Sequence, residues 1–322
     1  MKTYIIMAII IASISLFNCT PKANYDLVLT IVPASPGTGA GQDEMNAVAE
    51  VIIKRLNNSL GIPVEKIQYQ AAPSQISMTI PDTDSSDINT IRKVIVDNSK
   101  LEFRETYDNS ELSGNLKNAN DLLKHKGVAG AGTDNPLLDL LTPRIKRIGN
   151  QTTSSVIGIV SADDTSLVSR YLNMPEIKAL FPPDLNLMWS QKPYEYIHSG
   201  SYFELHAIRL TGRNGSAPLD GRAVASASVV KGPDASDIRI NLTMNPEGRT
   251  RWAEITRNNI GKCIAVVVNG HVRSYPRVMD EISGGNTEIT GDFTAGEAGD
   301  LVNILNSGYL PFKIKLAGVE VK

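Results

Sequence analysis

The stretch Asp43-Glu-Met-Asn-Ala-Val-Ala-Glu-Val-Ile-Ile-Lys-Arg-Leu56 decides the first helix of the fold. Its apolar residues recur three and four positions apart, which is the spacing of one helix face: Met45, Val48, Ala49, Ile52, Ile53 and Leu56. Asp43 and Glu44 suit the positive start of a helix. The pattern stops near 57–61, and Pro63 follows. An amphipathic helix is therefore expected here.

The segments around this helix indicate strands. A β-branched, apolar run precedes it, and two short runs flank the turn Ala72-Pro-Ser74. A second helix, capped by Asp84 or Ser85, leads to one more strand. The predicted strands are 28–32, 66–70, 75–80 and 101–106. The order β-α-β-β-α-β is the ferredoxin-like pattern, so we expect an α+β fold.

The C-terminal third repeats this alternation. Asn245 and Pro246 start a helix, Asn269-Gly270 is a strong hairpin turn, and Thr294 with Glu297 forms a capping box for the last helix. Strands are expected at 223–230, 238–244, 263–268, 271–275 and 312–316.

Residues 109–203 differ from the flanking parts. They are rich in loop residues, with helical segments at 164–172 and 175–180 and a set of aromatic residues: Phe181, Trp189, Tyr194, Tyr196, Tyr202 and Phe203. We interpret this segment as a loop-rich α/β head, inserted between two pseudo-repeated β-α-β halves of one ferredoxin-like base, 25–108 and 204–322. The aromatic residues are candidates for binding a partner, and the alternative is that Trp189, Tyr194, Tyr196 and Tyr202 form the small core of the insertion itself.

The N-terminus has the pattern of a secretory leader. Lys2 precedes an uncharged run from Tyr4 to Phe17, which is shorter than the about 20 residues that span a bilayer and fits a signal peptide. Cys19 closes the run as in a lipoprotein box, although Asn18 stands where a small residue is usual. We expect 1–19 to be a signal peptide and Cys19 to be lipidated, which anchors the chain to a membrane on the periplasmic side of the cell envelope. A simple signal and a short uncleaved anchor are the alternatives.

Charge and cysteine content argue against two classes of protein. The net charge is −2, whereas a nucleic-acid-binding surface needs clustered positive charge, so no nucleic-acid partner is expected. Of the 2 cysteines, one lies in the leader. Cys263 is then the single thiol of the folded body, which excludes a disulfide framework.

The sequence shows no motif for catalysis, metal binding or a cofactor. It has no Gly-x-Ser-x-Gly elbow, and its 4 histidines, His125, His198, His206 and His271, include no metal-spaced pair. The glycine-rich loop 37–41 lacks the Gly-Lys-Ser/Thr ending of a phosphate loop. We therefore expect a non-catalytic protein without cofactor or metal, in which His206 and His271 are structural or surface residues.

Two sets of short motifs follow one another in a fixed order. The first comprises 49–57, which ends in Arg-Leu-Asn, then Gly61-Ile-Pro63, 75–81 and Leu101-Glu-Phe-Arg104. The second comprises Leu219-Asp-Gly221, Asn245-Pro-Glu-Gly248, Ile282-Ser-Gly-Gly285, Ile289-Thr-Gly291 and Leu305-Asn-Ser-Gly-Tyr-Leu-Pro311. Together they resemble the first periplasmic domain of SecD, in the SecD/SecF protein-export family. Leu140-Leu-Thr-Pro143 and Met188-Trp-Ser190 resemble the form fused to SecF in Bacteroidetes-like bacteria.

This resemblance implies a ferredoxin-like base and a mobile head that engages the emerging polypeptide. It implies partners among exported unfolded proteins or Sec translocon subunits, bound by aromatic residues of the insertion: Phe181, Trp189, Tyr194, Tyr196 and Tyr202. SecD continues into transmembrane helices that couple to protons, whereas this chain stops at Lys322. We therefore expect a stand-alone lipoprotein with a passive module. The alternative is an envelope interaction or structural protein that kept the SecD-like fold but has another partner.

Overall fold

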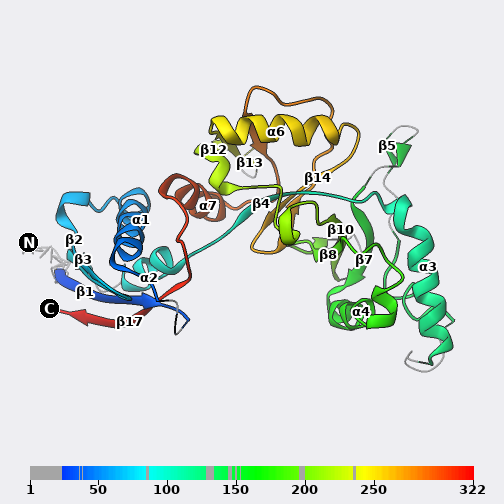
Figure 1. Ribbon diagram of the computed structural model, residues 1–322, viewed down its shortest axis with the longest axis horizontal. Helices are drawn as coiled ribbons and strands as arrows, with labels where there is room; N and C mark the ends of the chain where they lie inside the picture. Colours follow the sequence, from blue (N-terminus) through cyan, green and yellow to red (C-terminus); the bar gives the residue numbers. More distant parts are fainter. Residues whose placement is uncertain are drawn as a thin grey trace, which may run out of the picture.

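The computed structural model describes residues 24–35, 37, 39–84, 87–127, 134–143, 147–148, 151–152, 154–195, 200–234 and 237–322. The described chain is elongated, with a base at one end, a central unit that contains α6 and α7, and an inserted unit at the other end (Figure 1). Each of the three has its own buried apolar cluster. In the base, Asp26 and Lys322 exchange main-chain hydrogen bonds, so the two ends of the described chain lie together.

The base is a four-stranded antiparallel sheet with two helices on one face (Figure 1). Its elements are β1 (Asn24–Pro33), α1 (Gln42–Leu60), η1 (Val64–Lys66), β2 (Gln68–Ala72), β3 (Gln75–Asp84), α2 (Ile88–Val96) and β17 (Ile314–Val321). The strand order is β17-β1-β3-β2, so β3 splits the parallel strands β1 and β2 as in a ferredoxin-like fold. Leu27, Leu29 and Ile31 alternate inward from β1 onto the helices. The α+β class is confirmed.

The prediction for the last strand of the base was wrong. We expected 101–106 to complete the base sheet, but β4 (Leu101–Glu105) pairs with strands of the central unit. The edge beside β1 is occupied by β17 instead. Apolar residues at alternate positions indicate a strand in both segments, but such a pattern does not name the partner strand. The base therefore closes with the C-terminal strand.

The central unit contains most of the range predicted as the second half of the base. One sheet has β11 (Leu219–Asp220), β4, β14 (Ile264–Val268) and β15 (His271–Ser274), and another has β12 (Val224–Lys231), β13 (Ile238–Met244) and β16 (Asn286–Ile289). The helices α6 (Pro246–Asn258) and α7 (Ala295–Ser307) pack on a core shared by both sheets. Among the described strands of 204–322, β17 alone joins the base sheet. The predicted second half of the base is therefore a separate unit.

The inserted unit is more regular than the predicted loop-rich head. Its elements are α3 (Asn109–His125), β5 (Arg147–Ile148), β6 (Gln151–Thr152), β7 (Val156–Ser161), α4 (Thr165–Leu172), α5 (Pro175–Lys178), β8 (Leu185–Trp189), β9 (Tyr194–Glu195) and β10 (Ser201–Arg209). The sheet order is β7-β10-β8, with β9 on β10. The sequence indicated α4 and α5 but not α3, and β10 runs across the predicted boundary at 203.

A buried arginine joins the base to the central unit. Arg55 of α1 has no exposed surface. Its guanidinium donates hydrogen bonds to the carbonyl oxygens of Ile95 at 3.5 Å, Gly308 at 3.2 Å, and Asp97. These carbonyls stand at the C-terminal ends of α2 and α7, where the helix dipole is negative. Burial lowers the pKa of Arg55 to about 10, which leaves the group charged at neutral pH.

Replacement of Arg55 by Met should destabilise the protein strongly, because two buried helix ends then lose their donor. We expect the free energy of unfolding to fall by about 3–5 kcal/mol, measured by urea denaturation. Lys54→Met is the matched control, since Lys54 is the exposed neighbour on the same helix. An Arg55→Met variant with the urea midpoint of the control would contradict the role assigned to Arg55.

Candidate functional site

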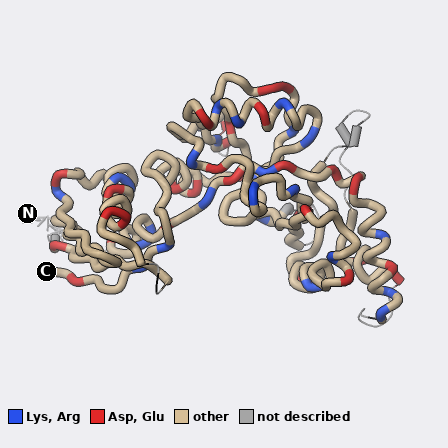
Figure 2. Tube along the Cα trace, viewed as in Figure 1, with Lys and Arg blue, Asp and Glu red and all other residues tan. Residues whose placement is uncertain are grey.

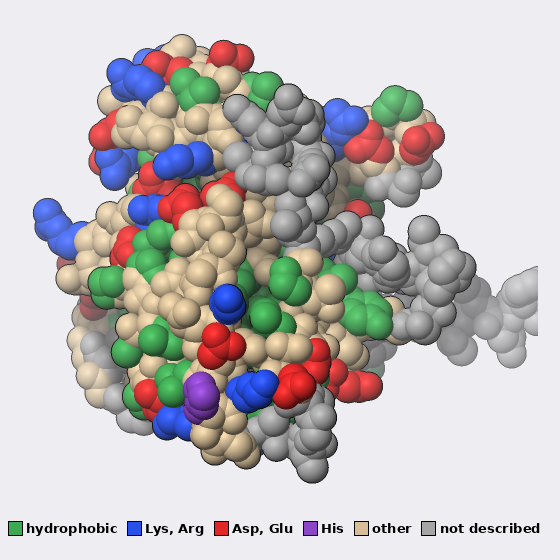
Figure 3. Space-filling model, turned by 90° about the vertical axis from the view of Figure 1, so that its right-hand side faces the viewer, with side chains coloured by type: hydrophobic (Ala, Val, Ile, Leu, Met, Phe, Trp, Pro, Cys, Tyr) green, Lys and Arg blue, Asp and Glu red, His purple; other side chains and the backbone are tan. Residues whose placement is uncertain are grey.

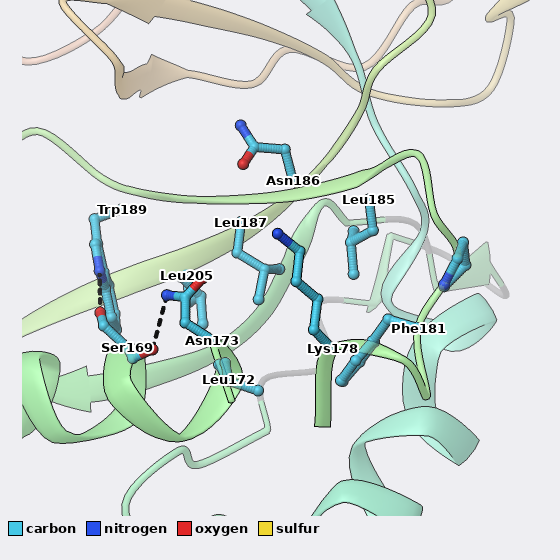
Figure 4. Close-up of a pocket in the computed structure, with 11 residues that line it drawn as sticks. Ser169, Leu172, Asn173, Lys178, Phe181, Leu185, Asn186, Leu187, Trp189 and Leu205 are labelled. Carbon is cyan, nitrogen blue, oxygen red and sulfur yellow. Dashed lines mark hydrogen bonds between the residues drawn. The ribbon is translucent and has the colours of Figure 1, made fainter. Parts of the chain in front are cut away.

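A cavity of about 90 Å³ opens in the inserted unit between α4, the turn after α5, and the strands β8 and β10 (Figure 4). Its lining combines apolar side chains with the polar residues Ser169, Asn173, Lys178 and Asn186, and the full set is Ser169, Leu172, Asn173, Lys178, Phe181, Pro182, Leu185, Asn186, Leu187, Trp189 and Leu205. Trp189 and Phe181 stand at opposite ends of the row of residues in Figure 4. We call this feature the inserted-unit cavity.

The strand register and one hydrogen bond hold the Trp189 wall of the cavity. Trp189 is the last residue of β8 and pairs with Leu205 of β10, so both side chains share one face of the sheet. The indole N–H of Trp189 donates to Ser169 Oγ on α4 at 3.1 Å. A buried or half-buried indole usually finds such a partner, and this bond fixes the ring at the edge of the cavity.

The opposite wall is set by a tight turn. Leu180 N–H donates to the Ile177 carbonyl at 3.0 Å, and Phe181 N–H donates to the Lys178 carbonyl at 3.2 Å. This turn directs the Phe181 ring inward, where it is 9% exposed. Lys178 itself is exposed and is the one charged residue of the lining.

The structure brings two of the predicted binding residues together. Phe181 and Trp189 line the inserted-unit cavity. Tyr202 pairs with Ser161 of β7 and Tyr194 of β9, is half-buried and does not line the cavity. The Tyr194 side chain, Tyr196 and Cys19 lie outside the described residues.

Sequence reasoning missed the polar part of this site. Ser169 and Asn173 lie four residues apart on α4 and its end, and the Asn173 amide donates to the Ser169 carbonyl at 2.8 Å. Their helical spacing was visible in the sequence, but the partner strand that faces them was not. The wall residue Leu205 was missed because the predicted boundary at 203 separated it from the insertion.

Two of the aromatic residues, Phe181 and Trp189, also serve the core of the inserted unit, which for Trp189 fits the alternative interpretation. Phe181 belongs to the buried cluster of this unit, and Trp189 packs against it. The end of the molecule formed by this unit shows apolar side chains scattered among charged ones rather than gathered in one patch (Figure 3). The described residues on the face seen in Figure 3 therefore present no broad apolar surface.

Known proteins resemble this chain along most of its length. Residues 208–312 match the family model described as "SecDF, P1 head subdomain". The chain is 29% identical over 303 residues to the protein translocase subunit SecD of Rhodothermus marinus, which covers 85% of this chain and 46% of that protein. It is 36% identical over 126 residues to SecD of Leptotrichia buccalis, and this match covers 39% of this chain and 31% of that protein. The chain therefore contains a domain that is similar to part of SecD.

Solved structures agree with the fold of this SecD-like domain. A SecDF structure described as "a membrane component SecDF that enhances protein export" has a TM-score of 0.51 at 19% identity, covering 91% of this chain and 99% of that chain. SecDF "in Super-membrane-facing form" has a TM-score of 0.53 at 20% identity, and the match covers 92% of this chain and 30% of that chain. The chain spans less than half the length of the two SecD relatives. In the described residues, no helix has the length and apolar character to cross a membrane.

The family model changes which part of the SecD-like domain is called the head. Its matched range, 208–312, covers the central unit apart from β4, whereas we predicted the head at 109–203. The inserted unit lies before that range except for the last two residues of β10. The quoted SecD-like motifs instead converge where base and central unit meet: Arg55 binds the Gly308 carbonyl, and Leu101 N–H donates to Tyr309 Oη at 3.2 Å.

A buried polar set lies between the inserted and central units of the SecD-like domain. His206 Nδ1 is 3.0 Å from Ser155 Oγ, and His206 Nε2 is 3.7 Å from a Glu204 carboxylate oxygen. The order serine, histidine, carboxylate is that of a hydrolase triad, but Ser155 and His206 have no exposed surface, so no substrate reaches the hydroxyl. Burial lowers the pKa of His206 to about 3. The prediction that His206 is structural agrees with this burial.

The buried neutral His206 should make stability depend on pH. Between about pH 6.5 and 3, the unfolded chain binds a proton at this position and the folded chain does not, so stability falls as pH falls. From pH 6.5 to 5 the free energy of unfolding should drop by about 1.5 kcal/mol because of His206. His206→Gln should remove this part of the pH slope in urea denaturation, and the exposed His271→Gln should retain it. Equal slopes in the two variants would contradict the assignment.

Proposed function

We propose that this SecD-like domain acts in protein export by binding segments of exported, unfolded polypeptide in the inserted-unit cavity, on the periplasmic side of the cell envelope. The observation that carries the proposal is the open cavity walled by Trp189 and Phe181. The names of the relatives, protein translocase subunit SecD, support the export context. The module is non-catalytic in this proposal, because binding alone uses the groups that line the cavity.

The geometry of the cavity favours weak, repeated capture. Trp189 is held by Ser169 and by its strand, so its ring does not have to be ordered when a ligand arrives. The cavity is small, so it receives part of a chain and not a folded partner. Lys or Arg and Asp or Glu are interspersed in all three units (Figure 2), so the described residues show no large region of one sign of the kind that attracts a nucleic acid.

The proposal includes a location near the translocon. A SecD-like domain held at the membrane by a lipidated Cys19 would meet chains as they emerge. Proton-driven pulling is not part of the proposal.

Photo-crosslinking in cells tests the binding proposal. A photoreactive phenylalanine analogue at Trp189 should crosslink to varied exported proteins or to translocon subunits, identified by mass spectrometry. The same analogue at Tyr69, which is 39% exposed on the base, is the matched control and should give far fewer such products. Recovery of a single unrelated envelope protein from Trp189 would support the alternative, an envelope interaction protein with another partner.

Membrane fractionation tests the anchor. Cys19→Ala should move the protein from the membrane fraction to the soluble periplasmic fraction, because the acyl chains that contribute about 0.8 kcal/mol per buried CH₂ are then missing. Cys263→Ala is the control, since Cys263 is buried in the folded body, and should fractionate like the unaltered chain. Unchanged membrane association of Cys19→Ala would refute lipidation at this residue.

A further inference from the structure

The size of the inserted-unit cavity limits what it can hold. Its volume is about 90 Å³, whereas an engineered apolar protein cavity that takes up benzene measures about 150 Å³. A branched aliphatic group with three or four carbons fits the smaller space, and an aromatic ring does not fit without displacing a wall. The walls resist displacement, because Leu172, Phe181 and Leu205 belong to the packed core of the unit.

The charge at the mouth of the cavity is not compensated. Lys178 is exposed, and its ammonium extends over the row of leucines in Figure 4. The lining contains no carboxylate, and nearby acids are engaged elsewhere: Glu176 pairs with Lys126, and Asp184 accepts from Tyr107 Oη. Among the described residues, Lys178 forms an ion pair with neither of these two acids. Within the lining, a ligand carboxylate would therefore find one positive partner, Lys178, and no carboxylate beside it.

Building on the proposed function, we propose that the cavity selects polypeptide segments in which a branched aliphatic side chain, such as that of leucine, is followed by an acidic residue. The aliphatic group enters between Phe181 and Trp189, and the carboxylate stays outside on Lys178. Aromatic and basic segments are disfavoured, the first by size and the second by charge.

Short acetylated Gly/Ser peptides carrying one dipeptide each test this selectivity, with affinity measured by fluorescence anisotropy on the purified chain. Leu-Asp should bind more tightly than Ala-Asp by about tenfold or more, because of the additional buried carbons. It should also bind more tightly than Phe-Asp. The advantage of Leu-Asp over Leu-Lys should be about threefold at low salt and should shrink as salt rises.

Lys178→Glu should reverse the preference between Leu-Asp and Leu-Lys. Lys117→Glu is the matched control, since Lys117 is an exposed lysine on α3 of the same unit outside the cavity lining, and it should keep the original preference. If all peptides bind equally and Trp189→Ala abolishes that binding, the selectivity is overturned. The proposed function then still stands. No binding of any peptide would overturn both.

Discussion

A single buried guanidinium, that of Arg55, is the interaction on which the arrangement of the units depends. It lies on α1 of the base and donates hydrogen bonds to main-chain carbonyl oxygens at the C-terminal ends of α2 and α7. A buried charge without partners costs several kcal/mol, so this group is stable only while both helix ends remain in place. Asn303 of α7 adds a hydrogen bond to the Arg55 carbonyl at 3.3 Å. The base and α7 therefore behave as one piece.

The other end of α7 connects to the inserted unit by the same kind of interaction. Glu297, in the first turn, accepts from Lys192 of the inserted unit at 3.0 Å and from Arg273 at 2.9 Å. Burial would raise the pKa of Glu297, but these hydrogen bonds and that from Thr294 N–H lower it to about 2. A cation thus meets the negative end of α7 and an anion sits at its positive end, as the helix dipole favours. One helix positions both neighbours of the central unit.

The sequence predicted the elements that carry their own local signals. The helical period of α1, the Asn245 cap of α6 and the capping box of Thr294 and Glu297 all depend on residues within one turn. The partner of β4 could not be predicted, because pairing is decided by distant chain. The helix α3 was missed although Leu112, Leu116, Ala119 and Leu123 keep helical spacing, because Gly114 and several asparagines lower the helix propensity of this segment. Its buried face packs into the core of the inserted unit.

The candidate site was predictable only in part for a related reason. A small unit needs large side chains to build a core, so aromatic residues in its sequence indicate stability as readily as binding. Phe181 and Trp189 fit both interpretations, because each packs into the core on one side and borders unfilled space on the other. What separates a binding wall from a core residue is that space, together with the uncompensated charge of Lys178 beside it. Both arise from how α4, α5, β8 and β10 meet, and no single segment of sequence contains that information.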